Sequence, residues 1–278
     1  MKQRLLRWLR SRGSGRQSDA GTLPIKTLTL GAHVFAIHGI AVDDPYFRSL
    51  RDDFEPDFSQ ICRRFVREDS ICLDVGANIG IKTLSLSRHV SAGCVIAIEP
   101  APTVVPVLRR NIELNRAHNV VIEATAIGDF SGTVKFADAS AYGHVDVDHG
   151  GVEVPMMTLP ELVKRLGLPR VDFLKIDVEG FEFPILRSCL DLITEHRTRV
   201  LFEFNSWCQV AYGDTNPRVF LEWVLANFAE VSLVRGRSGG PLLDPVGRGR
   251  QEMLRVLHKN FVLDGCVNDV LALPRPRS

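Results

Sequence analysis

From Ile71 onward, short apolar runs alternate with longer stretches of helical periodicity. The runs that we interpret as strands are residues 71–75, 94–98, 119–124, 171–176 and 199–204. The stretches that we interpret as helices are residues 79–89, 102–116, 158–166 and 181–195. Strands that alternate with helices in this way form a parallel sheet with helices on both faces. The alternation therefore predicts an α/β fold.

Residues 129–157 interrupt this alternation with short β-like runs and nearby glycines. We interpret them as a β-hairpin insertion whose tip lies at residues 142–151. After the fifth predicted strand, the pattern indicates a helix near 217–228 and strands at 230–235 and 268–273. No internal repeat is evident in this part of the sequence.

The N-terminal end differs in composition from the rest of the chain. Residues 1–20 contain six Lys and Arg residues against Asp19 alone, and we interpret them as a basic tail. Such a tail could contact an anionic membrane as a short amphipathic helix, and we favour the alternative of a solvated tail. Residues 21–70 form a predicted strand and helix extension, and residues 71–278 form the predicted main domain.

The charge and the cysteines of the chain limit the classes of partner and the location that we expect for it. The formal net charge is +1, and because the tail is basic the remainder is mildly acidic, which argues against a nucleic-acid partner. A mildly acidic chain after the tail remains compatible with a small-molecule or glycan partner. The six cysteines form no C-x-x-C pair, which favours reduced thiols and a cytoplasmic location. The oligomeric state is not readable from the sequence.

A glycine-rich loop follows the first predicted strand, with the sequence DVGANIG at residues 74–80. The glycines allow the backbone to approach a ligand closely, and the helix that follows points free N–H groups at the loop. A dinucleotide site would have a second glycine where Asn78 stands, and Asp74 is a poor neighbour for pyrophosphate. The cationic groups and single carboxylate of S-adenosylmethionine suit this loop better.

An acidic residue, Glu99, ends the second predicted strand nineteen positions after Gly80. A carboxylate at this position can accept hydrogen bonds from the hydroxyl groups of an adenosine ribose. The loop and Glu99 together therefore predict a site for S-adenosylmethionine.

Two segments of the sequence resemble one known family. The loop at residues 74–80 looks like the cofactor loop of class I S-adenosylmethionine-dependent methyltransferases. The later segment DFLKIDVEGFE at residues 172–182 is similar to the signature of the FkbM family within that class. Smaller agreements occur at residues 111–115, 126–129 and 158–159.

The resemblance implies a Rossmann-like fold with a seven-stranded, mostly parallel sheet and an antiparallel last strand. It also implies transfer of a methyl group to a hydroxyl of a sugar, a glycan or a polyketide-type natural product. The cofactor-binding residues that it implies are Asp74, Gly76, Ala77, Asn78, Gly80, Glu99, Ala126 and Ile127.

Acidic residues follow the fourth and fifth predicted strands, where ligands of open α/β sheets bind. Asp177, Glu182 and Glu203 are the candidate catalytic residues, since an alcohol acceptor must lose its proton. His144 or His38 could assist as a base that titrates near neutral pH.

A second mechanism places a divalent cation such as Mg²⁺ on Asp177, Glu203 and Asn205, and we do not favour it over the first. The identity of any metal stays unknown. Two other functions remain as alternatives: a nucleic-acid or protein methyltransferase, and a non-catalytic scaffold subunit that binds the cofactor. The mildly acidic chain after the tail and the absence of an Asn/Asp-Pro-Pro-aromatic motif after the fourth strand count against base methylation.

Overall fold

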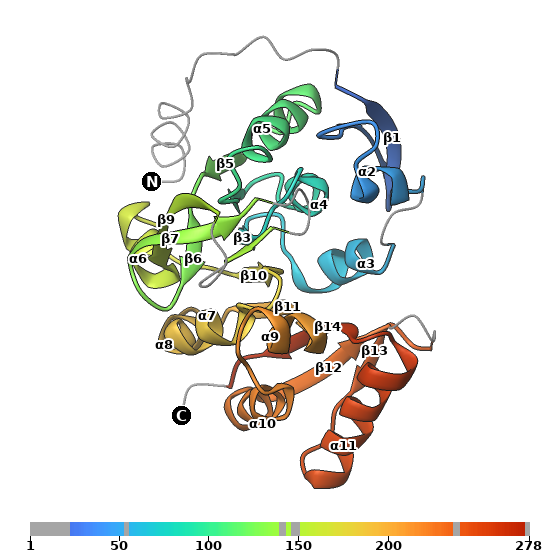
Figure 1. Ribbon diagram of the computed structural model, residues 1–278, viewed down its shortest axis with the longest axis vertical. Coiled ribbons are helices and arrows are strands. Elements are labelled where there is room, and N and C mark those ends of the chain that lie inside the picture. Colours follow the sequence, from blue (N-terminus) through green and yellow to red (C-terminus); the bar gives the residue numbers. More distant parts are fainter. Residues whose placement is uncertain (1–22, 53–55, 139–142, 146–150, 236–239, 276–278) are drawn as a thin grey trace. The chain divides into compact units, whose positions relative to one another are not determined.

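The computed structural model describes residues 23–52, 56–138, 143–145, 151–235 and 240–275 (Figure 1). The predicted tail and most of the predicted hairpin tip lie outside these residues. The chain divides into two compact units. The first contains Met1–Ala126 and Asp138–Tyr142, and the second contains Ile127–Ala137 and Gly143–Ser278.

The sheet of the first unit is parallel and buried. Its strands are β3 (Ile71–Val75), β4 (Cys94–Ile98) and β5 (Val120–Glu123), in the order β3-β4-β5. Every residue of β3 and β4 is buried, as expected for strands covered on both faces. Helices α4 (Ile81–His89) and α5 (Val105–Leu114) follow β3 and β4 along the chain. The predicted strand and helix alternation is confirmed here.

The predicted N-terminal extension forms part of the first unit. Strands β1 (Ile25–Leu30) and β2 (His33–His38) form an antiparallel hairpin, which helices α2 (Pro45–Ser49) and α3 (Pro56–Phe65) follow. Asn111 of α5 accepts a hydrogen bond from the backbone N–H of His38 at 2.7 Å. The same side chain donates to the carbonyl oxygens of His38 and Ile79. The hairpin is therefore bonded to α5 and to the end of the glycine loop.

The sheet of the second unit is mixed. Strand β10 (Phe173–Ile176) is parallel to β11 (Arg199–Asn205). The last strand, β14 (Val267–Leu273), is antiparallel to β11 and to β12 (Glu230–Val234), as predicted. A short strand, β13 (Leu243–Pro245), pairs with the outer side of β12 and was not predicted.

The predicted insertion is a β-structure. Strand β7 (Gly132–Ala137) pairs with β8 (His144–Val145) and with β9 (Val152–Thr158), and the short strand β6 (Ala126–Gly128) precedes them. Helix α6 (Leu159–Arg165) starts at Thr158, whose side chain caps it.

The remaining helices of the second unit partly depart from the prediction. The single helix predicted at residues 181–195 is two helices, α7 (Glu182–Ser188) and α8 (Leu190–His196), because the backbone of Cys189 leaves the helical region at φ −117°. Helix α9 (Ser206–Ala211) and the predicted helix α10 (Pro217–Asn227) follow β11.

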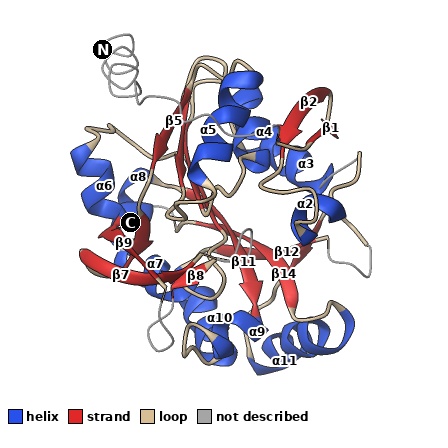
Figure 2. Ribbon diagram, turned by 45° about the horizontal axis from the view of Figure 1, so that its top comes forward, coloured by secondary structure: helices blue, strands red, loops and turns tan. Residues whose placement is uncertain are grey.

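The helix α11 (Arg250–His258) and the π-helical turn η2 (Lys259–Leu263) were not predicted. Helix α10 packs against β12 and α11, beside the strands of this unit (Figure 2). Among the described residues, no helix is long and apolar enough to cross a membrane.

Candidate functional site

The glycine loop of the first unit follows β3 and leads into α4. Its residues Gly76, Asn78 and Gly80 all have positive φ angles, of 74°, 51° and 95°. Glycine adopts this conformation freely, and asparagine tolerates it better than most residues. A side chain at position 80 would also lie 2.6 Å from a methyl carbon of Leu108. The sequence therefore has glycine where the turn requires it.

The loop is held against β4 and leads into a helix that has no side-chain cap. The N–H groups of Gly76 and Ala77 both donate to the carbonyl of Ile98 at 3.0 Å, which holds the loop against the end of β4. The first residue before α4 is Gly80, and no side chain caps this helix. The N–H groups of the first turn and the helix dipole at this end favour a carboxylate or phosphate.

Asp74 is fully buried near the end of β3 and accepts a hydrogen bond from the hydroxyl group of Thr83 on α4. This bond fixes the strand to the helix on either side of the loop. Burial and the nearby charge of Asp74 raise the pKa of the Cys62 thiol, which therefore stays protonated. All six cysteines are free thiols. Contact between Asp74 and a cofactor stays a prediction.

Glu99 joins the glycine loop to the segment after β4. One carboxylate oxygen accepts from the N–H of Asn78 at 2.8 Å, and the other accepts from the N–H of Ala101 at 3.0 Å. A carboxylate oxygen can accept more than one hydrogen bond, so these bonds are compatible with a ligand hydroxyl. The loop and the acidic residue that the sequence paired therefore meet in the structure. Ala126 and Ile127 are buried in β6, and their contact with adenine stays a prediction.

The second unit has an acidic cluster, which consists of Asp177, Glu179 and Glu203. One carboxylate oxygen from each lies within 4.8 Å of the others. Asp177 follows β10, and its carboxylate lies 3.7 Å from the ammonium group of Lys175. Glu203 lies near the end of β11 and accepts from the side chain of Asn205 at 3.3 Å. The structure thus brings together two of the three predicted catalytic residues.

Glu179 is the member of the cluster that was not among the predicted catalytic residues. It lies between β10 and α7, which begins three residues later at Glu182. Glu179 adopts a left-handed conformation at φ 54°, which is uncommon for a residue with a side chain. Its carboxylate accepts a hydrogen bond from the thiol of Cys208 on α9 at 3.0 Å. Such strain is a feature of functional sites.

Burial and mutual repulsion make the acidic cluster retain protons. Burial and then the charge of Asp177 raise the pKa of Glu179. The pKa of Glu203 is well above its ordinary value, because of burial and then the charges of Asp177 and Glu179. Carboxylates at this separation cannot all ionise at little cost, and they titrate as a group. The cluster can therefore exchange a proton at higher pH than isolated carboxylates.

Glu182, the third predicted catalytic residue, is fully buried at the start of α7. Its two oxygens accept from the N–H groups of Val178 and Gly180 at 2.9 and 3.1 Å. A side chain at Gly180, whose φ is 105°, would lie 2.4 Å from the carbonyl oxygen of Cys208. Glu182 thus fixes the tight loop that carries Glu179, and a direct catalytic role stays a prediction.

The two predicted histidines lie in different surroundings. His144 stacks on Tyr212 with ring centroids 3.7 Å apart, and its charge lowers the pKa of Glu179. The pairing of these two rings could not be read from the sequence, because 67 residues separate them. His38 is buried in β2 and is bonded through its backbone to α5. His144 is therefore the one beside the acidic cluster.

The oxygen atoms of the acidic cluster are of the kind that Mg²⁺ prefers. The set differs from the predicted one, because Glu179 takes the place of Asn205. The side-chain oxygen of Asn205 accepts from the N–H of Cys208 at 3.1 Å and caps α9. The close ammonium group of Lys175 already balances part of the negative charge.

Comparisons with known proteins give a consistent result. A family model described as the methyltransferase FkbM domain matches residues 74–222. Methyltransferase 1 of Beauveria bassiana is 31% identical over 149 residues, which cover 45% of this chain and 60% of that protein. The hexuronic acid methyltransferase AglP of Haloferax volcanii is 30% identical over 145 residues, which cover 51% of this chain and 58% of that protein. The chain thus spans somewhat more than half the length of these curated relatives.

Solved structures of similar chains were also found. An S-adenosylmethionine-dependent O-methyltransferase from Thermotoga maritima has a TM-score of 0.48 and 15% identity, over 84% of this chain and 70% of that one. The methyltransferase FkbM from Methylobacillus flagellatus has a TM-score of 0.38 and 18% identity, over 62% of this chain and 44% of that one.

Proposed function

Because this chain belongs to the FkbM methyltransferase family, we propose that it transfers the methyl group of S-adenosylmethionine to a hydroxyl group. The acceptor that we propose is a sugar, a glycan or a polyketide-type natural product. The observation that carries the proposal is the pair of bonds from Glu99, which joins the glycine loop to the end of β4. The name of the Haloferax volcanii relative supports a sugar acid as one class of acceptor.

The residues of the first unit suit the cofactor part by part. The uncapped start of α4 would hold its carboxylate, and the buried charge of Asp74 favours its cationic end. Glu99 would accept hydrogen bonds from the ribose hydroxyls. Bound S-adenosylmethionine supplies a methyl group that its sulfonium activates.

The acidic cluster of the second unit would accept the proton of the acceptor hydroxyl. The raised pKa values of Glu179 and Glu203 make their carboxylates stronger bases than isolated carboxylates, which suits a general base. The alternative, a cluster that holds Mg²⁺ and lowers the pKa of the hydroxyl, uses the same oxygen atoms. Activity that EDTA abolishes and Mg²⁺ restores would favour the cation, and activity that EDTA leaves unchanged would favour the base.

Calorimetry with S-adenosylmethionine tests the cofactor site. The wild type should bind at micromolar concentration, and Asp74→Ala and Glu99→Ala should each weaken binding by about 1–3 kcal/mol, as for lost hydrogen bonds to charged groups. Glu113→Ala, on the exposed side of α5, is the matched control and should bind like the wild type. No binding by the wild type would contradict the proposal.

Methyl transfer tests the reaction. The protein, with methyl-labelled cofactor, would be incubated with methyl glycosides of hexoses and hexuronic acids and with a set of hydroxylated polyketides. Asp177→Asn and Glu203→Gln should lower turnover and leave cofactor affinity unchanged, because Asp74 and Glu99, which we propose to hold the cofactor, lie in the other unit. Label that enters only added protein or RNA would contradict a small-molecule or glycan acceptor, and so would label that enters nothing.

A further inference from the structure

Helix α9 shows an inverted distribution of polar and apolar side chains. Ser206 and Gln209 are buried, whereas Trp207 and Val210 are 67% and 63% exposed. A surface helix ordinarily buries its apolar side chains and exposes its polar ones. Large apolar side chains that remain exposed together mark interaction sites.

The turn η2 has the same inversion. Asn260 and Asp264 are fully buried, whereas Phe261, Val262 and Leu263 between them are 49%, 64% and 58% exposed. Three consecutive exposed apolar residues are a fault in a folded protein unless they have a function.

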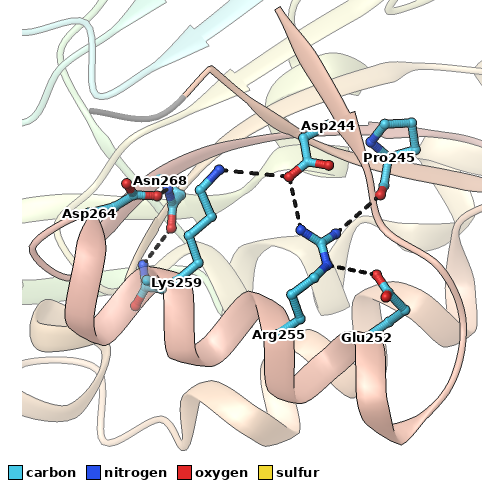
Figure 3. Close-up of polar contacts among 8 residues, drawn as sticks. Asp244, Pro245, Glu252, Arg255, Lys259, Asp264 and Asn268 are labelled. Atoms are coloured by element: carbon cyan, nitrogen blue, oxygen red, sulfur yellow. Dashed lines mark hydrogen bonds and ion pairs between the residues drawn. The ribbon is translucent and has the colours of Figure 1, made fainter. Parts of the chain in front are cut away.

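A polar network prevents this turn from hiding its apolar residues (Figure 3). Asn260 donates to the side-chain oxygen of Asn268 at 2.9 Å, and Asn268 donates to Asp264 at 2.6 Å. At the first residue of η2, the ammonium group of Lys259 lies 3.7 Å from the carboxylate of Asp244. Rotating η2 so that its apolar side chains turn inward would leave these buried groups without partners, which is costly.

Helix α9 and the turn η2 are connected to neighbouring ends of two paired strands, β11 and β14. Asn205 at the end of β11 is paired with Val267 at the start of β14, so α9 begins where η2 ends. The backbone N–H of Ser206 donates to the carbonyl of Cys266 at 2.9 Å. The hydroxyl of Ser206 donates to the side chain of Asn260 at 2.6 Å. We call the exposed side chains of these two segments the apolar ledge: Trp207, Val210, Phe261, Val262 and Leu263.

The apolar ledge and the acidic cluster share helix α9. Cys208, between Trp207 and Gln209, bonds to Glu179, and Asn205 before the first residue of the helix bonds to Glu203. A molecule that lies on Trp207 and Val210 is therefore within the width of one helix of the groups that we propose to take a proton. The ledge has no charged side chain of its own, so its partner is apolar.

We infer that the apolar ledge binds the hydrocarbon part of the methyl acceptor, which is therefore an amphiphile. The acceptor combines a hydroxyl group, held near the acidic cluster, with an alkyl, acyl, isoprenoid or polyketide chain that lies on the ledge. This inference rests on the proposed function and narrows its substrate class. A flat bilayer fits less well, because it would also remove water from the carboxylates beside the ledge.

Alkyl glucosides test the inference without a known acceptor. The probes are methyl, hexyl and octyl β-D-glucopyranoside below their micelle concentrations, and the signal is the fluorescence of Trp207, with Trp207→Phe as the blank. The emission should shift to the blue with the hexyl and octyl probes and not with the methyl probe. Affinity should rise about fourfold for each methylene group that is buried.

Two aspartate variants make the test specific. Val262→Asp should weaken binding of the octyl probe at least tenfold. Val42→Asp, at a valine that is equally exposed in the first unit, should bind like the wild type. Thermal unfolding of each variant shows whether it is folded. Equal affinity for the methyl and octyl probes, or for the wild type and a folded Val262→Asp, would overturn the inference.

Other occupants of the ledge give different results. A blue shift with phosphatidylcholine vesicles but none with the octyl probe would overturn the inference in favour of a membrane surface. A dimer of the wild type that Val262→Asp dissociates, with no binding of the octyl probe, would overturn it in favour of a second copy. Calorimetry with S-adenosylmethionine reports on the proposed function separately, because Asp74 and Glu99, which that test changes, lie in the first unit.

Discussion

Ionisation of Glu182 should make the stability of the protein fall as the pH rises. Burial, and to a smaller extent the charge of Asp177, raises the pKa of this carboxyl group from 4.5 to about 8, although the N–H of Val178 and the N–H of Gly180 favour its ionised form. Between these two values the folded protein keeps a proton that the unfolded chain has lost. The free energy of unfolding then decreases with increasing pH across this window.

The size of the effect follows from the shift. Each pKa unit corresponds to about 1.4 kcal/mol, so the full difference between pH 4.5 and 8 is about 5 kcal/mol. No reduction for solvent exposure applies, because the side chain is fully buried. Relaxation of the loop on ionisation makes this figure an upper value, and we expect to measure about 2–5 kcal/mol.

Glu182→Gln is the perturbation, since glutamine cannot ionise. Urea unfolding of both proteins at pH 5 and pH 8.5 gives the free energy of unfolding, and the difference between variant and wild type should move by that amount in favour of the variant. The loss of one backbone bond is the same at both pH values and cancels. Glu153→Gln, on the exposed side of β9, is the control and should show no change with pH. A difference for Glu182→Gln that is constant within 0.5 kcal/mol, roughly the effect of an ordinary surface substitution, would refute the reasoning.

Three further substitutions test the loops by chemical unfolding and calorimetry. Gly180→Ala should lower the free energy of unfolding by more than about 2 kcal/mol, because it adds a steric clash to a positive φ angle. The control Gly167→Ala also has a positive φ angle, but its new methyl group would meet no atom, so it should lower the free energy of unfolding by only about 1 kcal/mol. Glu99→Gln should lose about 1–3 kcal/mol of stability and weaken S-adenosylmethionine binding, with Glu113→Gln unchanged in both. Thr83→Val should lose about 1–3 kcal/mol, because it removes the hydroxyl that bonds to the buried carboxylate of β3. Stabilities within 0.5 kcal/mol of the wild type would contradict each of these assignments.

The parts of the fold that could be predicted are those where side-chain polarity and burial agree. Strands β3 and β4 were predicted to the residue, because each is a short apolar run with a glycine or proline close behind it. The turn η2 was missed because Asn260 and Asp264 are buried and the apolar residues between them are exposed. A pattern of polarity misleads where side-chain hydrogen bonds replace apolar packing.

The candidate site shows the same limit. Glu99 and the glycine loop could be paired from their spacing, because adjacent parallel strands end at the same edge of a sheet. Glu179 was not among the predicted catalytic residues, since a left-handed backbone leaves no mark on a single sequence. The contact between His144 and Tyr212 depends on tertiary structure, and no local pattern reports it.

The side-chain amide of Asn111 links the N-terminal hairpin to the glycine loop. Its oxygen and nitrogen join β2 to the carbonyl of Ile79, where the glycine loop enters α4. A chain shortened to begin at residue 70 would keep the bond from Asn111 to the carbonyl of Ile79 and would lose the two bonds between Asn111 and His38 that fix the orientation of the amide. Loss or replacement of the hairpin would therefore allow this amide to turn and would loosen the end of the glycine loop.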